Sequence, residues 1–153
     1  MRLDELTRPG LIFADLSGLD SHIVLRDIAD RIATRGFVKD SDALYRGLCE
    51  REELGSTGVG SGVAIPHCKM EDLEQVVLAV GISRQGIDFA AVDGRPVRLF
   101  FVVVSPSDRP ASHLQSLASI SKWVKADRHV ERILALQDPD KIFELLRTEA
   151  SAP

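Results

Sequence analysis

One short segment of the chain gathers residue types that can transfer chemical groups. Residues 54–69, LGSTGVGSGVAIPHCK, carry four glycines and then Pro66, His67 and Cys68. If residues 58–68 are extended, their side chains alternate between two faces. One face then has only small residues and lets another segment approach the backbone closely. The other face runs through apolar residues and ends in the imidazole of His67, a nucleophile whose unperturbed pKa is about 6.5.

The spacing of the glycines excludes several well-known phosphate and nucleophile sites. No Lys-Ser or Lys-Thr pair follows them, so the GxxxxGK[ST] loop is absent. A dinucleotide site needs GxGxxG between a strand and a helix, whereas G-x-G-x-G here follows a predicted helix and precedes a predicted strand. Ser61 has Val59 and Val63 two residues away, where a nucleophile elbow has glycines.

Cys68 does not make this segment a metal or thiol site. Because His67 and Cys68 are adjacent, a strand directs them to opposite faces, which disfavours a shared metal ion. A buried, inert thiol is the commoner state of a free cysteine. We therefore expect neither a metal nor another cofactor, and His67 remains the candidate. By its position at the end of an apolar strand, however, His67 fits a structural histidine better than a nucleophile.

The composition limits the kinds of partner. With 19 Lys and Arg against 23 Asp and Glu, the net charge is -4 and no basic block exists, which argues against nucleic acid. The longest apolar runs, VRLFFVVV and VVLAVGI, have the length of strands and are too short to span a membrane. The first residues lack the apolar core of a signal peptide, and the two cysteines form no CxxC. We expect a soluble cytoplasmic protein.

Hydrophobic periodicity predicts an α/β fold. No internal repeat or linker interrupts the chain, so we expect a single domain over residues 1–153 with a loose tail at 148–153. β-branched runs predict buried strands, and helical periodicity with capping signals predicts helices. The predicted strands are residues 11–15, 76–83 and 97–105, and the predicted helices are residues 19–35, 41–54, 111–126, 127–137 and 138–149. This order indicates a sheet covered by helices.

For several other polar side chains, both a role in binding an anion and a purely structural or surface role are possible. His113 lies near the start of a predicted helix, where free N–H groups favour an anion, but a surface histidine is the more ordinary interpretation. Arg51 belongs to the charged run REE, which is usually solvated. Ser56 and Thr57 offer hydroxyls or backbone N–H groups to a phosphate, and turn formation explains them equally well.

Two motifs resemble a known family. RxxLGSTGVGSGVAIPH, from Arg51 to His67, is similar to the active-site signature of the IIA component of bacterial phosphotransferase systems, fructose/mannitol class. SHLQSLASIS, from Ser112 to Ser121, is similar to the second marked segment of that family. The resemblance covers nearly the whole chain and looks most like the nitrogen-related branch. It implies the type-2 EIIA fold, a mixed β-sheet of about five strands flanked by helices on both faces. Cys68 departs from it, because Gly or another small residue is expected there.

The resemblance implies a phosphoryl carrier, a phosphotransferase component with a phosphohistidine intermediate rather than a multiple-turnover enzyme. His67 would accept phosphate from a small HPr-like phosphocarrier protein. His113 would stabilise the phosphoryl group by a hydrogen bond, and Arg51 would neutralise its charge. Ser56 and Thr57 would be further phosphate contacts. The onward partner would be a IIB component or regulatory target proteins. Because no IIB domain or membrane segment is attached, we expect a regulatory role, with fructose- or mannitol-type sugar uptake as the alternative.

The remaining expectations concern packing rather than chemistry. Leu19 and Ile23 are expected on the buried stripe of the first long helix, because they share its apolar spacing. His22 and His129 match no motif and are expected to be exposed residues on helices. Trp123 is expected in the core, because large aromatic side chains are mostly buried.

Overall fold

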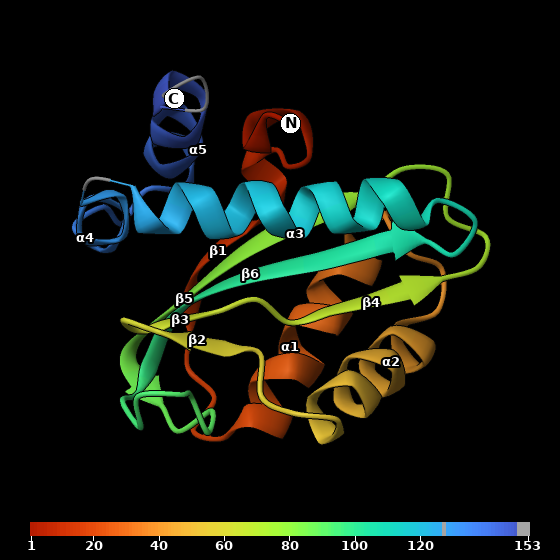
Figure 1. Ribbon diagram of the computed structural model, residues 1–153, viewed down its shortest axis with the longest axis horizontal. Coiled ribbons are helices and arrows are strands. Elements are labelled where there is room, and N and C mark those ends of the chain that lie inside the picture. Colours follow the sequence, from red (N-terminus) through yellow and green to blue (C-terminus); the bar gives the residue numbers. More distant parts are fainter. Residues whose placement is uncertain (127, 150–153) are drawn as a thin grey trace.

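The chain folds into a mixed sheet with helices on both sides (Figure 1). A computed structural model describes residues 1–126 and 128–149. Residue 127, which begins a predicted helix, and residues 150–153, in the predicted tail, lie outside the described part. In chain order the elements are η1 (Leu3–Glu5), η2 (Pro9–Leu11), β1 (Ile12–Leu16), α1 (Ser21–Thr34), α2 (Ser41–Glu53), β2 (Gly58–Gly60), β3 (Val63–Ala64), β4 (His67–Met70), β5 (Val77–Ile87), β6 (Val97–Pro106), α3 (Pro110–Lys125), α4 (His129–Leu134) and α5 (Pro139–Glu149). The predicted α/β fold class is confirmed.

Strand β6 is the centre of the sheet. β5 pairs with it antiparallel on one side, and β3 and β4 pair in parallel with successive parts of its other side. β1 lies parallel to β5, and β2 pairs antiparallel with β3. A central position suits β6, because a run that is apolar at nearly every residue is buried on both faces. The sheet has six strands instead of the expected five or so, because the glycine segment and its continuation form three short strands.

The two faces of β6 belong to separate hydrophobic cores. Phe100 and Val102 point into the core shared with α1 and α2. Phe101 and Val103 point into the core shared with α3, α4 and α5. All four side chains are fully buried. Figure 1 shows α3 lying along one side of the sheet and α1 with α2 on the other. The prediction of helices on both faces is therefore confirmed.

The glycine segment is a tight hairpin followed by β4, and the prediction of one extended strand over residues 58–68 is wrong. The chain turns back at Ser61 and Gly62, whose φ angles are 57° and 80°. Such angles lie in the left-handed region that glycine adopts without strain. The predicted alternation holds only after this turn, where Val63 faces the α3 core and Ala64 faces the α1–α2 core. Gly60 and Gly62 therefore allow the chain to reverse before it reaches His67.

Helices α1 and α2 both begin after an aspartate. Asp20 accepts a hydrogen bond from the backbone N–H of Ile23 at 2.9 Å, and Asp40 does the same for Ala43 at 3.0 Å. Each aspartate satisfies one of the free N–H groups in the first turn of its helix. Leu19 consequently lies before α1, and both Leu19 and Ile23 are exposed, contrary to the expected buried stripe.

The C-terminal part corrects two further expectations. His129 is buried rather than exposed. Its ring stacks on Trp123 at a centroid distance of 4.3 Å, and its Nδ1 lies 2.9 Å from the Trp123 carbonyl oxygen. α5 extends to Glu149, so the first two residues of the predicted tail are helical. The exposure of His22 and the burial of Trp123 are confirmed.

Cys68 packs between β4 and α2. It points into the α1–α2 core, on the face of β4 opposite to His67. A Cβ atom placed on Gly47 of α2 would lie 3.2 Å from the Cys68 Sγ and 3.3 Å from its Cβ. The thiol thus fills the space that Gly47 leaves open. Burial raises the pKa of the thiol to about 12, which keeps it protonated and inert.

We expect Gly47→Ala and Cys68→Gly to be strongly non-additive. Alanine favours a helix by about 1 kcal/mol over glycine, but crowding against Cys68 offsets that gain in the wild-type background. In the Cys68→Gly background the crowding is gone and alanine regains its advantage in the helix. The free energy of unfolding of the double variant should therefore be about 0.5–3 kcal/mol higher than the value obtained by adding the changes of the two single variants.

Urea unfolding of the four proteins measures this coupling. As a control, Gly47→Ala should combine with Ser116→Ala, in the opposite layer, additively to within about 0.5 kcal/mol. Equal additivity in both pairs would contradict the assigned contact.

Candidate active site

His67 begins β4, at an edge of the sheet where two helical layers meet. In the described part of the chain β4 pairs with β6 alone, so its other side is open. Figure 1 shows α3 on one side of β4 and α2 on the other. Side chains on β4 therefore reach α3 from one face and α2 from the other. His67 is half-buried at this junction.

The hydrogen bonds of His67 define its tautomer. Arg51 Nε lies 3.1 Å from His67 Nε2, and the Ile65 carbonyl oxygen lies 2.7 Å from His67 Nδ1. A guanidinium can only donate and a carbonyl can only accept. Nδ1 therefore carries the proton and donates to Ile65, while Nε2 keeps its lone pair and accepts from Arg51. The ring thus presents a nucleophilic nitrogen that is already next to a permanent positive charge.

Arg51 is held by the end of the helix that carries it. It lies in the last turn of α2, and its Nη1 donates to the Gly55 carbonyl oxygen at 2.8 Å. This bond satisfies a carbonyl just beyond the helix, where a cation is favourable. Fixed at both Gly55 and His67, the guanidinium covers the Nε2 lone pair. An electrophile must displace Arg51 from Nε2 before it can bond there.

His113 approaches His67 from the opposite layer. It lies in the first turns of α3, is 5% exposed, and its ring centroid is 5.4 Å from that of His67, with the two planes tilted by 57°. Its Nδ1 lies 2.7 Å from the Oγ of Ser105, which is fully buried on β6. The structure thus brings together the three residues that the sequence motifs selected, His67, His113 and Arg51.

Both imidazoles are uncharged at neutral pH. Burial lowers the pKa of His67, and the nearby Arg51 guanidinium lowers it further, against the opposing hydrogen bond to Ile65. Burial likewise lowers the pKa of His113 to about 4, with smaller contributions from His67 and Lys69. The positive charge at the site therefore comes from Arg51 and Lys69, while the rings supply a lone pair and hydrogen bonds.

Ser56 and Thr57 are used within the protein. The Ser56 hydroxyl donates to the Phe89 carbonyl oxygen at 2.6 Å. Thr57 is buried, and its hydroxyl and its backbone N–H both donate to the carboxylate of Glu52. Neither hydroxyl has a second proton to give a phosphate. This arrangement favours the turn-forming interpretation of both residues over phosphate contact.

Three contributors to the site escaped the sequence analysis. Glu52 fixes the start of the glycine segment by accepting hydrogen bonds from Thr57. In the sequence it is only one of the charged residues of the run REE. Lys69 lies on the same face of β4 as His67. Its position two residues after His67 in a strand could have indicated this from the sequence. Ser105 reaches His113 because the odd residues of β6 face α3, as Phe101 and Val103 also do. No local pattern in the sequence indicates that last contact.

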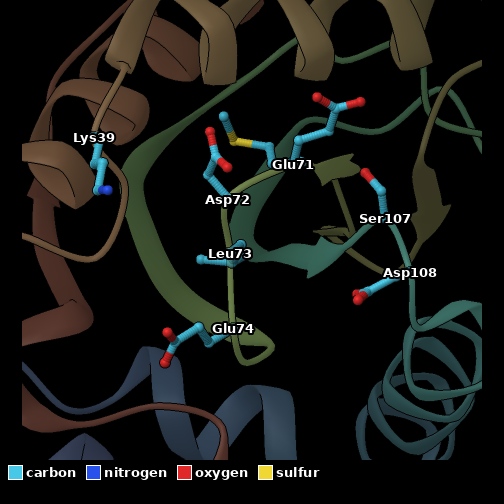
Figure 2. A pocket seen from close by; sticks show the side chains of 8 residues that line it. Lys39, Glu71, Asp72, Leu73, Glu74, Ser107 and Asp108 are labelled. Atoms are coloured by element: carbon cyan, nitrogen blue, oxygen red, sulfur yellow. The ribbon is translucent and has the colours of Figure 1, made fainter.

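A separate hollow of about 630 Å³ lies beyond the ends of β4 and β6 (Figure 2). Its side chains come from the end of β4, from the segments that follow β4 and β6, and from the loop between α1 and α2. Its charged lining residues are Lys39, Glu71, Asp72, Glu74 and Asp108. With four carboxylates and one ammonium group, this lining repels a phosphoryl group. The hollow is therefore unfavourable for an anion, whereas the junction at His67 has the positive charges of Arg51 and Lys69 nearby.

Comparison with known proteins identifies the family. Residues 5–149 match the family described as phosphoenolpyruvate-dependent sugar phosphotransferase system, EIIA 2. The chain belongs to this family. A nitrogen regulatory protein of Pseudomonas aeruginosa is 30% identical over 146 residues, which cover 95% of each chain. The resemblance drawn from the two motifs, including its nitrogen-related character, is confirmed.

Solved structures show the same fold. The nitrogen regulatory protein IIA-Ntr from Neisseria meningitidis superposes with a TM-score of 0.86 at 24% identity, covering 94% of this chain and 98% of that one. Enzyme IIAMTL from Escherichia coli, solved in complex with phosphorylated enzyme IIBMTL, superposes with a TM-score of 0.77 at 18% identity over 94% of this chain and 99% of that one. The chain is thus an EIIA type-2 protein by family and by fold.

Neither a membrane-crossing helix nor a metal-binding cluster occurs among the described residues. Among residues 1–126 and 128–149, no helix has the length and apolar character to cross a membrane. Within the same residues, no three or more His, Cys, Asp or Glu side chains gather in a way that could hold a metal ion.

The lowered pKa of His113 should make the protein less stable in acid. Between its unperturbed value of 6.5 and about 4, the unfolded chain binds a proton on this ring and the folded protein does not. The free energy of unfolding should therefore fall as the pH drops from about 6.5 to 4.

Urea unfolding of the wild type and His113→Gln over this pH range measures the effect. The variant lacks the titrating ring, so its stability should depend less on pH. Parallel curves for the two proteins would contradict the burial assigned to His113.

Proposed function

We propose that the protein is a phosphoryl carrier in which Nε2 of His67 accepts the phosphoryl group from a small HPr-like phosphocarrier protein. The observation that carries this proposal is the pair of hydrogen bonds that leaves the lone pair on Nε2 beside the Arg51 guanidinium. Membership of the EIIA 2 family supports it, because that family is part of a phosphotransferase system. A neutral imidazole is also the nucleophilic form, and the lowered pKa of His67 keeps it populated.

The transfer needs no proton movement at His67. The lone pair of Nε2 attacks phosphorus in line, and the bond between phosphorus and the donor protein breaks, returning its electron pair to the donor. Nδ1 keeps its proton and its hydrogen bond to Ile65 throughout. The ring therefore stays in one orientation before and after transfer, which reduces the reorganisation that the reaction requires.

Arg51 and His113 would receive the phosphoryl group. Arg51 leaves Nε2 and turns its planar fork to the phosphoryl oxygens, which it can bind in bidentate fashion. His113 donates a hydrogen bond from the other side without adding charge. Lys69 adds a second positive charge from the same face of β4. This combination steadies the dianion while leaving the P–N bond reactive enough for onward transfer.

Two onward roles differ in the acceptor. The Pseudomonas relative, which this chain matches over 95% of both lengths, is a nitrogen regulatory protein, and this favours a regulator whose phosphorylation state controls binding to target proteins. The alternative is a sugar-uptake component that passes phosphate to a IIB partner, as favoured by the likeness to enzyme IIAMTL in its IIB complex. Rapid transfer of label from His67 to a IIB protein favours uptake, and its absence favours regulation.

Phosphorylation at His67 is directly testable. The purified protein should take up label from phosphoenolpyruvate only when enzyme I and an HPr-like carrier are both present. The product should be labile in acid and stable in base, as a phosphoramidate is, and His67→Ala should abolish it.

The matched control is Cys68→Gly, which changes the next residue on the opposite face and should accept label like the wild type. Acid-stable label, or label that persists in His67→Ala, would rule out the assignment.

Arg51 and His113 should affect the rate of transfer rather than the place of attachment. His113→Ala should still become labelled but pass phosphate on or back more slowly, by up to about 100- to 1000-fold, the range for loss of one positioned donor. Arg51→Ala should also slow transfer, more steeply at low salt, where charge acts over longer distances. Arg51→Lys should recover only part of the rate, because an ammonium group lacks the bidentate fork.

Rapid-quench measurement of label transfer in both directions gives these rates. Arg46→Ala, an exposed arginine on the same helix, serves as the control and should transfer at the wild-type rate. If His113→Ala transfers at unchanged rates in both directions, His113 has no part in the reaction.

A further inference from the structure

Ser105 makes an unusual contact for a residue at the end of a central strand. Its side chain is completely buried, and its Oγ lies 2.7 Å from Nδ1 of the buried His113 ring. Within the described residues, Nδ1 is the one hydrogen-bond partner of this hydroxyl. The pair lies on the α3 side of β6, and the ring centroid of His113 is 5.4 Å from that of His67.

The direction of this hydrogen bond follows from the number of protons available. If Nδ1–H donated to Oγ, the serine proton would be buried with no acceptor, which costs about 1–3 kcal/mol. If the hydroxyl donates instead, its proton and the Nδ1 lone pair are both satisfied. The proton of the neutral ring then resides on Nε2. Within the described residues, this nitrogen makes no hydrogen bond and is free to donate.

We infer that Ser105 is a positioning residue that holds His113 as the Nε2–H tautomer, opposite to the Nδ1–H tautomer of His67. The two rings then have complementary roles: His67 presents a lone pair at Nε2, and His113 presents a proton at Nε2. The opposite tautomers are imposed by different partners, the Ile65 carbonyl for one ring and the Ser105 hydroxyl for the other.

The consequence for transfer rests on the proposed function. A neutral imidazole can donate to a phosphoryl oxygen only from its protonated nitrogen. If His113 carried its proton on Nδ1, its Nε2 lone pair would be the group available toward the phosphoryl anion and would repel it. Ser105 thus makes a histidine that is uncharged at neutral pH act as a donor, without touching the phosphoryl group itself.

Nitrogen-15 NMR of the unphosphorylated protein tests the proton position directly. With ring signals assigned through single His→Gln variants, His113 of the wild type should show a protonated Nε2 and an unprotonated Nδ1. Ser105→Ala should shift the population toward Nδ1–H by about two- to tenfold, the value of one neutral hydrogen bond. A wild-type ring protonated at Nδ1, or a tautomer population unchanged in Ser105→Ala, would overturn the inference.

Transfer kinetics test the consequence with a matched control. Ser105→Ala should transfer phosphate about two- to tenfold more slowly than the wild type. Ser116→Ala removes another fully buried serine hydroxyl, one that bonds to the Ser112 carbonyl and not to His113, and should leave the rate unchanged. Folded Ser105→Thr keeps the hydroxyl and should restore both the tautomer and the rate. Equal rates for Ser105→Ala and Ser116→Ala, or no recovery in folded Ser105→Thr, would overturn the positioning role.

The two measurements separate this inference from the proposed function. The NMR experiment involves no phosphate, so it reports on Ser105 even if no label reaches His67. A wild type that shows Nε2–H on His113 but accepts no label contradicts the carrier function alone. A wild type that accepts label on His67 but shows Nδ1–H on His113 contradicts the role of Ser105 alone.

Discussion

Parallel pairing of β4 with β6 sets the register on which the site depends. It places His67 opposite Val103 and Lys69 opposite Ser105, so that the odd residues of β4 face α3. A shift by one residue would turn His67 toward the α1–α2 core and bring Cys68 to the α3 side. Packing on the two faces of β4 opposes that shift, because Cys68 fills the space beside Gly47 of α2 and His67 lies against His113 of α3. The pairing of β4 with β6 thus determines that His67 faces α3 and that Cys68 faces α2.

Within that register, burial and permanent charge have separate tasks. Removing water from the two imidazoles keeps them neutral, which is the form that the proposed transfer requires of a nucleophile and of an uncharged donor. The positive charge is supplied by Arg51, because a guanidinium is a permanent cation. A site built from protonated histidines would lose its charge within the physiological range, whereas this one keeps the same electrostatic character across it.

The two family motifs, residues 51–67 and 112–121, selected the three residues that the structure brings together, whereas the helix start alone favoured an ordinary surface histidine at His113. Period-two reasoning failed over the hairpin, because Ser61 and Gly62 adopt left-handed conformations that break the alternation. It succeeded after the turn, where packing on both faces enforces it. Ser105 could not be predicted, since its role depends on how α3 packs against β6 and on counting protons in a buried pair. Local patterns predict elements and motifs, while such contacts require the assembled layers.

The unpaired edge of β4 also bears on how the protein avoids aggregation with copies of itself. An unpaired strand edge offers free N–H and C=O groups to any other extended chain, which is a route to aggregation. β4 is only four residues long and bears the exposed, charged side chain of Lys69. Short length and an edge lysine are two devices by which natural sheets discourage edge-to-edge growth. The Lys69 ammonium group, which lies on the same face of β4 as His67, therefore also disfavours pairing of this edge with another chain.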